Sequence, residues 1–146
     1  MVAVNVYLTF DGNCEEAFNF YKSVFGGEFA VFTRFNEMPS VEGQPAMSEA
    51  DGNLVMHVML PISAETSLMA SDTGSAWSSN FKQGNNCSLS INTTSKDEAD
   101  HLFNGLSAGG QITMPLEQTF WGAYFGMFTD KFGVHWMVNY DEPQDK

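Results

Sequence analysis

The sequence predicts an α+β fold, in which a single domain of 146 residues holds two βαβββ modules. Two observations lead to this prediction. An amphipathic helix-like segment occurs twice, at residues 13–27 and 95–110, and each copy ends in a glycine pair. Strand-like runs precede and follow the two copies in the same order, as expected for a duplicated supersecondary unit. The expected boundaries are module one at about 1–72, a linker at about 73–86, module two at about 87–140 and a short acidic tail at 141–146.

In module one, a strand-like run at residues 4–10 precedes the helix. The apolar side chains of the helix recur with the spacing of one helical face. They are Cys14, Ala17, Phe18, Tyr21, Val24 and Phe25. Asn13 and Glu16 predict a capping box at the start, and Gly26–Gly27 predicts the end. The three strands that follow are expected within 28–35, 53–60 and 66–71.

Module two repeats this plan after a strand-like run at residues 87–92. Its helix has apolar side chains at Ala99, Leu102, Phe103 and Leu106. Ser95 and Glu98 predict a second capping box. Glu98 follows Glu16 by 82 positions and Gly109 follows Gly26 by 83. Strands are then expected within 111–116, 123–130 and 134–140.

Composition limits the classes of partner. The formal charge is −12, from 18 acidic and 6 basic residues, and the bases are scattered. Nucleic acids and anionic membranes are therefore poor partners, because phosphate contacts need a basic face. Arg34 is the only arginine, which argues against a dedicated phosphate clamp. With two cysteines, no signal peptide and no long apolar run, the expected location is the reducing cytoplasm.

The linker "SDTGSAWSSNFKQGNN" places two large aromatic residues, Trp77 and Phe81, among small polar ones. Aromatic side chains of this size are costly to leave in water. We expect them to form a homodimer contact, and the alternative is a lid folded over the chain's own pocket. Because each chain is strongly acidic, a dimer contact should be largely apolar and insensitive to salt, or tightened by it.

Two segments carry a resemblance to a known family. "YLTFDGNCEEAFNFYKSVFGG" and "WGAYFGMFTDKFGVHWMVN" resemble the opening and closing motifs of the PhnB-like family, also described as demethylubiquinone methyltransferase-like. The closing motif has the form W-G-x-x-x-G-x-x-x-D-x-x-G-x-x-W, and "VMHVML" and "LMASD" also match. Lys131 and Ala123 depart from residues common in the family. The resemblance covers nearly the whole chain and implies the glyoxalase-like vicinal-oxygen-chelate fold, in which two curved sheets form a cup, and commonly a dimer.

The resemblance also implies where metal ligands would stand. Metal-dependent relatives use His and Glu on the first and last strands of each module, which here correspond to positions at or near Val6, Met69, Asn86 and Met137. Apolar side chains have no lone pair for a hard cation, and thioethers suit only soft ions. We therefore expect no metal of the inherited type and no other cofactor.

Other chemistry has little support in the sequence. There is no G-x-G that would hold the cofactor of a methyltransferase, and no G-x-S-x-G, H-E-x-x-H or phosphate-binding loop. Cys14 lies in a helix first turn, where the helix dipole favours a reactive thiolate, but it also belongs to the apolar face, so we do not expect a reactive thiol. Glu15 and Glu16 match the helix dipole rather than an acid–base pair. Glu49 and Asp51 flank an expected turn.

Two functions remain open. The first is a metal-free cup that binds a small, partly apolar molecule, which aromatic and Met side chains would line. The second is a metal-dependent enzyme of the glyoxalase or dioxygenase type, with a site rebuilt from His57, His135 or nearby acids. His101 is expected at the helix surface. The pocket candidates are Tyr7, His57, Met69, Asn86, Ser88, Trp121, Tyr124, His135 and Met137.

Overall fold

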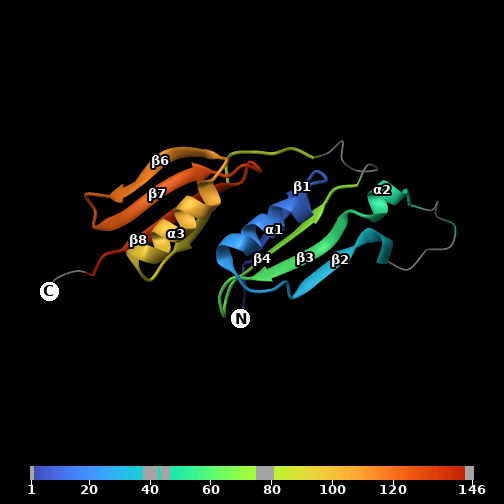
Figure 1. Cartoon of the computed structure of the whole chain (residues 1–146), viewed down its shortest axis with the longest axis horizontal. Coiled ribbons are helices and arrows are strands. Elements are labelled where there is room, and N and C mark those ends of the chain that lie inside the picture. Colours follow the sequence, from blue (N-terminus) through green and yellow to red (C-terminus); the bar gives the residue numbers. More distant parts are fainter. Residues whose placement is uncertain (1, 38–42, 44–46, 75–80, 144–146) are drawn as a thin grey trace. The chain divides into compact units, whose positions relative to one another are not determined.

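The computed structural model describes residues 2–37, 43, 47–74 and 81–143. It divides into two compact units, Met1–Lys82 and Gln83–Lys146. Each unit has one long helix and a four-stranded mixed sheet in the order βαβββ (Figure 1). The predicted α+β class and the duplicated plan are confirmed.

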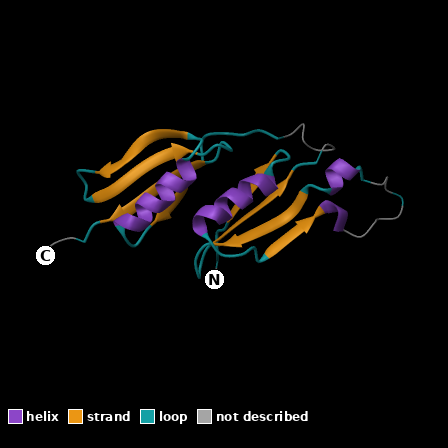
Figure 2. Cartoon of the chain, viewed as in Figure 1, coloured by secondary structure: helices purple, strands orange, loops and turns teal. Residues whose placement is uncertain are grey.

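Unit 1 contains a mixed sheet in the strand order β1-β4-β3-β2. Strands β1 and β4 run parallel, while β3 runs antiparallel to both β2 and β4. The elements are β1 (Val6–Phe10), α1 (Cys14–Phe25), β2 (Val31–Arg34), the 3-10 turn η1 (Phe35–Glu37), α2 (Glu49–Gly52), β3 (Val55–Pro61) and β4 (Ser67–Asp72). Helix α1 packs on one face of this sheet, against β3 and β4 (Figure 2).

Unit 2 repeats the topology with the strand order β5-β8-β7-β6. Strands β5 and β8 run parallel, and the other two pairs are antiparallel. The elements are β5 (Leu89–Asn92), α3 (Lys96–Ser107), β6 (Gln111–Gln118), β7 (Ala123–Thr129) and β8 (His135–Asp141). Helix α3 contacts β6, β7 and β8 from one side of the sheet.

The long helices form where the apolar spacing predicts them. The buried residues of α1 and α3 are Cys14, Ala17, Phe18 and Tyr21, and Ala99, Leu102, Phe103 and Leu106. Both helices therefore bury the one apolar face that amphipathic spacing provides. The short helix α2 was not predicted. Its Ser48 cap accepts a hydrogen bond from the Asp51 N–H, so a helical turn replaces the expected open turn.

The capping prediction holds for one helix and is wrong for the other. In α3, the Ser95 hydroxyl accepts from the Glu98 N–H at 3.1 Å, and the Glu98 carboxylate accepts from the Thr94 N–H at 3.1 Å. In α1, the Asn13 side chain makes no capping hydrogen bond. A carboxylate from a distant strand, Asp72, occupies that role instead.

Asp72 is the last residue of β4 and is 4% exposed. Its Oδ1 accepts from the backbone N–H groups of Gly12 at 3.1 Å and Cys14 at 2.9 Å. Its Oδ2 accepts from the Val55 N–H at 2.9 Å. One buried carboxylate thus joins the start of α1, the start of β3 and the end of β4. A buried charge is tolerated where hydrogen bonds replace its hydration.

The linker lies partly outside the described residues. Trp77 is outside the described residues, and residues 144–146 of the acidic tail are outside them as well. Phe81 is half-buried. The expected boundary of module one coincides with the end of β4, whereas β8 continues to Asp141, one residue into the expected tail. No helix in the described ranges is both long and apolar enough to cross a membrane.

Candidate functional site

Each sheet has one face covered by its own helix, and we call the opposite side the open face of that unit. In unit 1 the helix-covered side is marked by the buried residues Phe10, Val58, Leu60, Leu68 and Ala70. Side chains alternate along strands, so their neighbours belong to the other side. The open face of unit 1 comprises Tyr7, Thr9, Val31, Thr33, His57, Met59, Ser67, Met69 and Ser71.

A stacked ring pair dominates the open face of unit 1. The rings of Tyr7 and His57 are parallel, with an interplanar angle of 6° and centroids 5.8 Å apart. Strand β4 lies between the strands that carry them, so the rings meet over β4. The Tyr7 hydroxyl lies 3.5 Å from His57 Nδ1, at the outer limit of a hydrogen bond. Tyr7 is 50% exposed, so this stack is accessible to a ligand.

Thioethers lie beside this stack. Met59 of β3 and Met69 of β4 are directly opposite each other in the antiparallel register. Met69 is also the register partner of Tyr7. The structure therefore brings three of the predicted pocket residues, Tyr7, His57 and Met69, onto one face. Met59 was missed, although its place two residues after His57 puts it on the same side of a strand.

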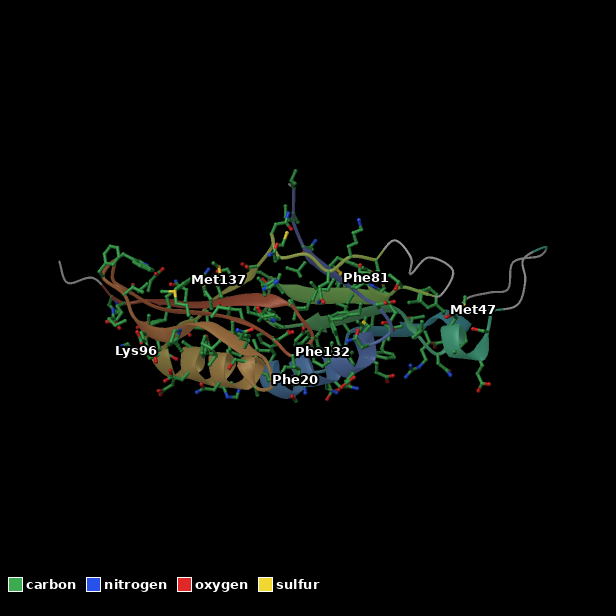
Figure 3. All side chains as sticks on the ribbon, turned by 90° about the horizontal axis from the view of Figure 1, so that it is seen from above. Phe20, Met47, Phe81, Lys96, Phe132 and Met137 are labelled. Atoms are coloured by element: carbon green, nitrogen blue, oxygen red, sulfur yellow. The ribbon has the colours of Figure 1, made fainter. Side chains whose placement is uncertain are left out.

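In unit 2 the helix-covered side is marked by Phe128, Trp136 and Val138, and the ring of Phe128 contacts Phe103 of α3. The open face comprises Ser90, Asn92, Gln111, Met114, Glu117, Phe125, Met127, Thr129, His135, Met137, Asn139 and Asp141. Figure 3 shows Met137 on the side of the sheet away from α3, whose first residue, Lys96, is also labelled. Strand alternation along β8 accordingly places Met137 on the open face and Trp136 under the helix.

Polar and apolar groups alternate on the open face of unit 2. His135 Nδ1 lies 2.9 Å from the Thr129 hydroxyl, its cross-strand partner. The next pair along is Met127 and Met137. Further along β7, the ring of Phe125 contacts Trp121, with centroids 6.1 Å apart. Trp121 is 52% exposed in the turn before β7.

Three of the predicted pocket residues do not join these groups. Tyr124 lies on the helix-covered side, because its hydroxyl donates to Asp100 of α3 at 2.6 Å. This hydrogen bond raises the pKa of the Tyr124 phenol. Asn86 and Ser88 are exposed and precede β5, outside the strand. The strand alternation that would place Tyr124 was available in the sequence, whereas the start of β5 was not.

The positions that correspond to the metal ligands of relatives do not fit a hard metal ion. Val6 alternates with Tyr7 and shares the helix-covered side with Phe10. Met69 and Met137 offer thioethers, and Asn86 offers an amide before the strand begins. Hard divalent cations prefer carboxylate and carbonyl oxygens, and ions such as Zn²⁺ also bind imidazole. In the described part of the chain, no three His, Cys, Asp or Glu side chains are grouped so that they could hold a metal.

Cys14 is buried with 0% exposure. Burial raises the pKa of its thiol far above the usual range, and the carboxylates of Asp72 and Glu15 raise it further. A thiol with a raised pKa is a poor nucleophile. Glu15 is engaged in a bidentate ion pair with Arg34, with N–O distances of 3.1 and 2.7 Å. Neither residue is available for acid–base or nucleophilic chemistry.

The W-G-x-x-x-G-x-x-x-D-x-x-G-x-x-W motif builds the β7–β8 hairpin rather than a reactive centre. Asp130 accepts hydrogen bonds from the N–H groups of Phe132 and Val134 and from Trp136 Nε1, at 2.8, 3.0 and 2.8 Å. Gly133 has a φ of 88°, which favours glycine. A Cβ on Gly126 would lie 2.7 Å from the Phe103 ring. Most of the motif is therefore explained by the fold.

Comparisons with known proteins agree with this architecture. Protein YjdN of Escherichia coli K12 is 35% identical over 141 residues, which covers 91% of each chain. The crystal structure of protein PA1353 from Pseudomonas aeruginosa is 41% identical, with a TM-score of 0.83, and covers 98% of this chain and 100% of that one. A PhnB protein structure from Bacillus cereus is 28% identical, with a TM-score of 0.72, and covers 95% and 99% of the two chains.

A more distant structure shares the fold alone. It is a glyoxylase/bleomycin resistance protein/dioxygenase domain from Frankia sp. EAN1pec, 14% identical with a TM-score of 0.65, covering 97% and 98% of the two chains. The family profile described as 3-demethylubiquinone-9 3-methyltransferase matches residues 3–139. With its paired βαβββ units and its opening and closing motifs, the chain belongs to this PhnB-like family, and it shares its fold with the glyoxylase/bleomycin resistance protein/dioxygenase domain.

Proposed function

We propose that this protein binds a small, partly apolar molecule on its open sheet faces, without a hard metal ion of the kind that metal-dependent relatives use. The observation that supports the proposal most directly is the accessible Tyr7–His57 stack beside Met59 and Met69. Small-molecule sites combine aromatic and apolar lining with a few polar groups. Thioethers adapt to irregular shapes and contact ring edges favourably.

The charges of the molecule restrict the class of ligand. The strand residues that form the open face of unit 1 carry no Asp, Glu, Lys or Arg. Arg34, the single arginine, already binds Glu15 and the Asn53 carbonyl. A net charge of −12 repels anions at long range. The ligand is therefore a neutral or positively charged planar compound rather than a phosphate, phosphonate or carboxylate.

The family description names a methyltransferase, but methyl transfer is not part of this proposal. No G-x-G occurs anywhere in the sequence, so the glycine-rich loop typical of cofactor sites is absent. We expect isothermal titration calorimetry with S-adenosylmethionine to give no saturable heat. Saturable binding in the micromolar range would contradict this expectation.

The binding proposal is tested by NMR on protein labelled with 13C at the methionine methyl groups. The probes are indole and quinoline as neutral rings, benzylamine as a cation and benzoate as an anion. The first three should shift the Met59 and Met69 methyl signals at millimolar concentration, and benzoate should not.

Two variants show whether the stack is responsible. Tyr7→Leu removes one ring of the stack and should abolish the shifts. Tyr124→Phe changes a tyrosine on the helix-covered side and should preserve them. If none of the four probes moves the Met59 and Met69 signals, or if the Tyr7→Leu protein responds like the parent, the proposed site is wrong.

We also propose that the protein is a homodimer through a largely apolar contact. In addition to the linker aromatics, Phe120 is 97% exposed and packs only edge-on against Trp121 among the ring contacts described. Exposed aromatic groups of this kind mark interaction surfaces. Light scattering at low and moderate salt should give twice the chain mass of 16.1 kDa. A monomer at tens of micromolar would refute the dimer, and a dimer that survives Trp77→Ala/Phe81→Ala would refute the role of the linker.

A further inference from the structure

Both open faces carry the same three-residue arrangement, which the proposed function does not require. In unit 1, His57 and Met59 are two residues apart on β3, and Met69 lies opposite Met59. In unit 2, His135 and Met137 are two residues apart on β8, and Met127 lies opposite Met137. Each unit thus presents one imidazole and two thioethers on one side of two neighbouring strands.

Unit 2 adds a third thioether to this arrangement. Met114 of β6 is the register partner of Met127, so Met114, Met127 and Met137 follow one another across three adjacent strands. Side chains directly opposite each other in antiparallel strands have Cβ atoms about 4.5–5.5 Å apart. Diagonal neighbours such as His135 and Met127 remain within reach of long side chains. Methionine, with its flexible unbranched side chain, can bring these sulfur atoms together.

The imidazole of His135 is oriented by a neighbouring side chain, as is common for histidines that bind metals. Its Nδ1 lies 2.9 Å from the Thr129 hydroxyl. The other ring nitrogen, Nε2, does not take part in this contact and is the one that would bind a metal. Histidines that bind metals commonly use one ring nitrogen while the other hydrogen-bonds to a neighbouring oxygen. Thr129 is the cross-strand partner of His135, so the sheet register itself fixes this contact.

We propose that the open face of unit 2 is a binding site for a soft monovalent cation of the Cu(I) or Ag(I) type. The ligands are the thioethers of Met127 and Met137 and Nε2 of His135, with Met114 as a fourth donor. Thioethers select Cu(I) over hard ions, and imidazole also suits copper. A site of this composition discriminates against Mg²⁺, Ca²⁺ and Mn²⁺, which need oxygen ligands.

The related arrangement in unit 1 is a weaker site. It has two thioethers, because the β2 partner of Met59 is Val31. The ring of Tyr7 stacks on His57, and its hydroxyl lies 3.5 Å from Nδ1, too far to hold the imidazole firmly. Unit 1 therefore provides the matched control for the site in unit 2.

The test uses Ag(I), a redox-stable probe, with protein labelled at the methyl groups of its nine methionines. All proteins carry Cys87→Ser, because Cys87 is an exposed free thiol that would compete for soft ions, whereas Cys14 is buried. In chloride-free buffer, one equivalent of Ag(I) should shift the Met127 and Met137 methyl signals stoichiometrically. One equivalent of Zn²⁺ or Mn²⁺ should leave them unchanged. Anaerobic competition against bicinchoninate then measures the affinity for Cu(I).

The variants decide between the two faces. Met127→Leu/Met137→Leu should weaken Ag(I) binding by at least about 100-fold. Loss of a residue that only hydrogen-bonds to a metal ligand already weakens metal binding by about 10–100-fold, and here two ligands themselves are lost. Met59→Leu/Met69→Leu should change the affinity for Ag(I) less than about threefold, because Met59 and Met69 lie in unit 1 and the proposed ligands lie in unit 2. If the first variant does not fold, as judged by circular dichroism, His135→Asn provides the second reading and should weaken binding at least about tenfold.

Three results would overturn the inference. The first is no shift of the Met127 and Met137 signals at ten equivalents of Ag(I). The second is an affinity that survives the loss of both thioethers or of His135. The third is an equal loss in the Met59→Leu/Met69→Leu control. None of these results bears on the shifts of Met59 and Met69 with organic probes, so failure here and failure of the proposed function can be told apart.

Discussion

The N-termini of α1 and α3 are capped in two different ways. Backbone N–H groups in the first turn of a helix have no partner within the helix. In α3 the residues next to that turn supply the acceptors, through Ser95 and Glu98. In α1 the acceptor comes from Asp72, 58 positions beyond Cys14 in the chain. The second helix is therefore capped locally, and the first is capped only when its sheet has formed.

This difference has a consequence for stability. A local cap stabilises its helix by about 1 kcal/mol and leaves the rest of the unit largely unaffected. Asp72 also accepts from Val55, so its loss would affect a helix and a strand together. Hydrogen bonds to a charged group contribute about 1.5–3 kcal/mol each, and buried donors that lose their partner add a desolvation cost. Unit 1 should be more sensitive to a single substitution than unit 2.

The largest expected effect is that of Asp72→Ala. Three backbone N–H groups would lose their acceptor, and the free energy of unfolding should fall by at least about 3 kcal/mol. Asn13→Ala, at the position where the sequence suggests a cap, should cost less than about 0.5 kcal/mol. Urea titrations followed by circular dichroism measure both. A loss below about 1 kcal/mol for Asp72→Ala would show that water or a neighbour replaces the carboxylate.

The next effect concerns the packing of unit 2 at Gly126. An added Cβ would lie 2.7 Å from the Phe103 ring and 2.8 Å from the Leu116 Cα, so the Phe103 ring on α3 and the backbone of β6 would have to move. We expect Gly126→Ala to cost about 1–3 kcal/mol, the range for overpacking a core. Gly84→Ala serves as the control, because its Cβ would meet only Asn86 at 3.7 Å. Equal stabilities of the two variants would refute the close approach of α3 to β7.

A smaller effect is expected for the local cap of α3. Ser95→Ala removes the acceptor of the Glu98 N–H and should cost about 1 kcal/mol. Ser95→Asp should preserve most of the stability, because aspartate is an equally good cap. The same urea titrations measure both. If Ser95→Ala proved as costly as Asp72→Ala, the contrast between local and distant capping would fail.

The smallest effect is a pH dependence at the ion pair that links α1 to β2. The hydrogen bond from Arg34 lowers the pKa of the Glu15 carboxyl from its ordinary value of 4.5. A lowered pKa in the folded state means that the stabilisation is complete above the ordinary value and is lost as pH falls through the folded pKa. Because both side chains are partly exposed, the contribution should stay below about 1 kcal/mol.

The comparison of wild type with Glu15→Gln isolates this term. The difference between their unfolding free energies should be greatest above pH 4.5 and should shrink as the solution becomes more acidic. Glu16→Gln, at the adjacent position in the same helical turn, is the control. A difference that grows toward acid pH would contradict the assigned direction.

Much of the fold follows from patterns that operate over short distances. Helical spacing locates α1 and α3, glycine pairs locate their ends, and the capping box of α3 is readable because Ser95 and Glu98 are three residues apart. The motif from Trp121 to Trp136 is readable for the same reason, since Asp130 contacts residues within six positions of itself. Interactions of this range depend on few other elements, which is why a sequence pattern can reveal them.

The candidate site was only partly readable. His57 and Met69 were identified as candidates, but the stack of His57 with Tyr7 joins residues 50 positions apart and forms over a third strand. The row of Met114, Met127 and Met137 likewise depends on the register of three strands, and β6 contains irregularities on both sides of Met114. Registers of this kind are set by the whole sheet, because a shift by one residue turns every side chain to the other face.

The sequence by itself determined the duplicated βαβββ plan, the apolar faces of the two long helices and the family to which the chain belongs, because each is carried by periodic spacing or by closely spaced motif residues. Only the tertiary structure decided that Asp72 rather than Asn13 caps α1, that the partner of the Tyr124 hydroxyl is Asp100 of α3, and that His135 pairs with Thr129 across the strands. The physical reason is that these contacts join separate strands and helices, whose partners are chosen by the packing of the complete unit.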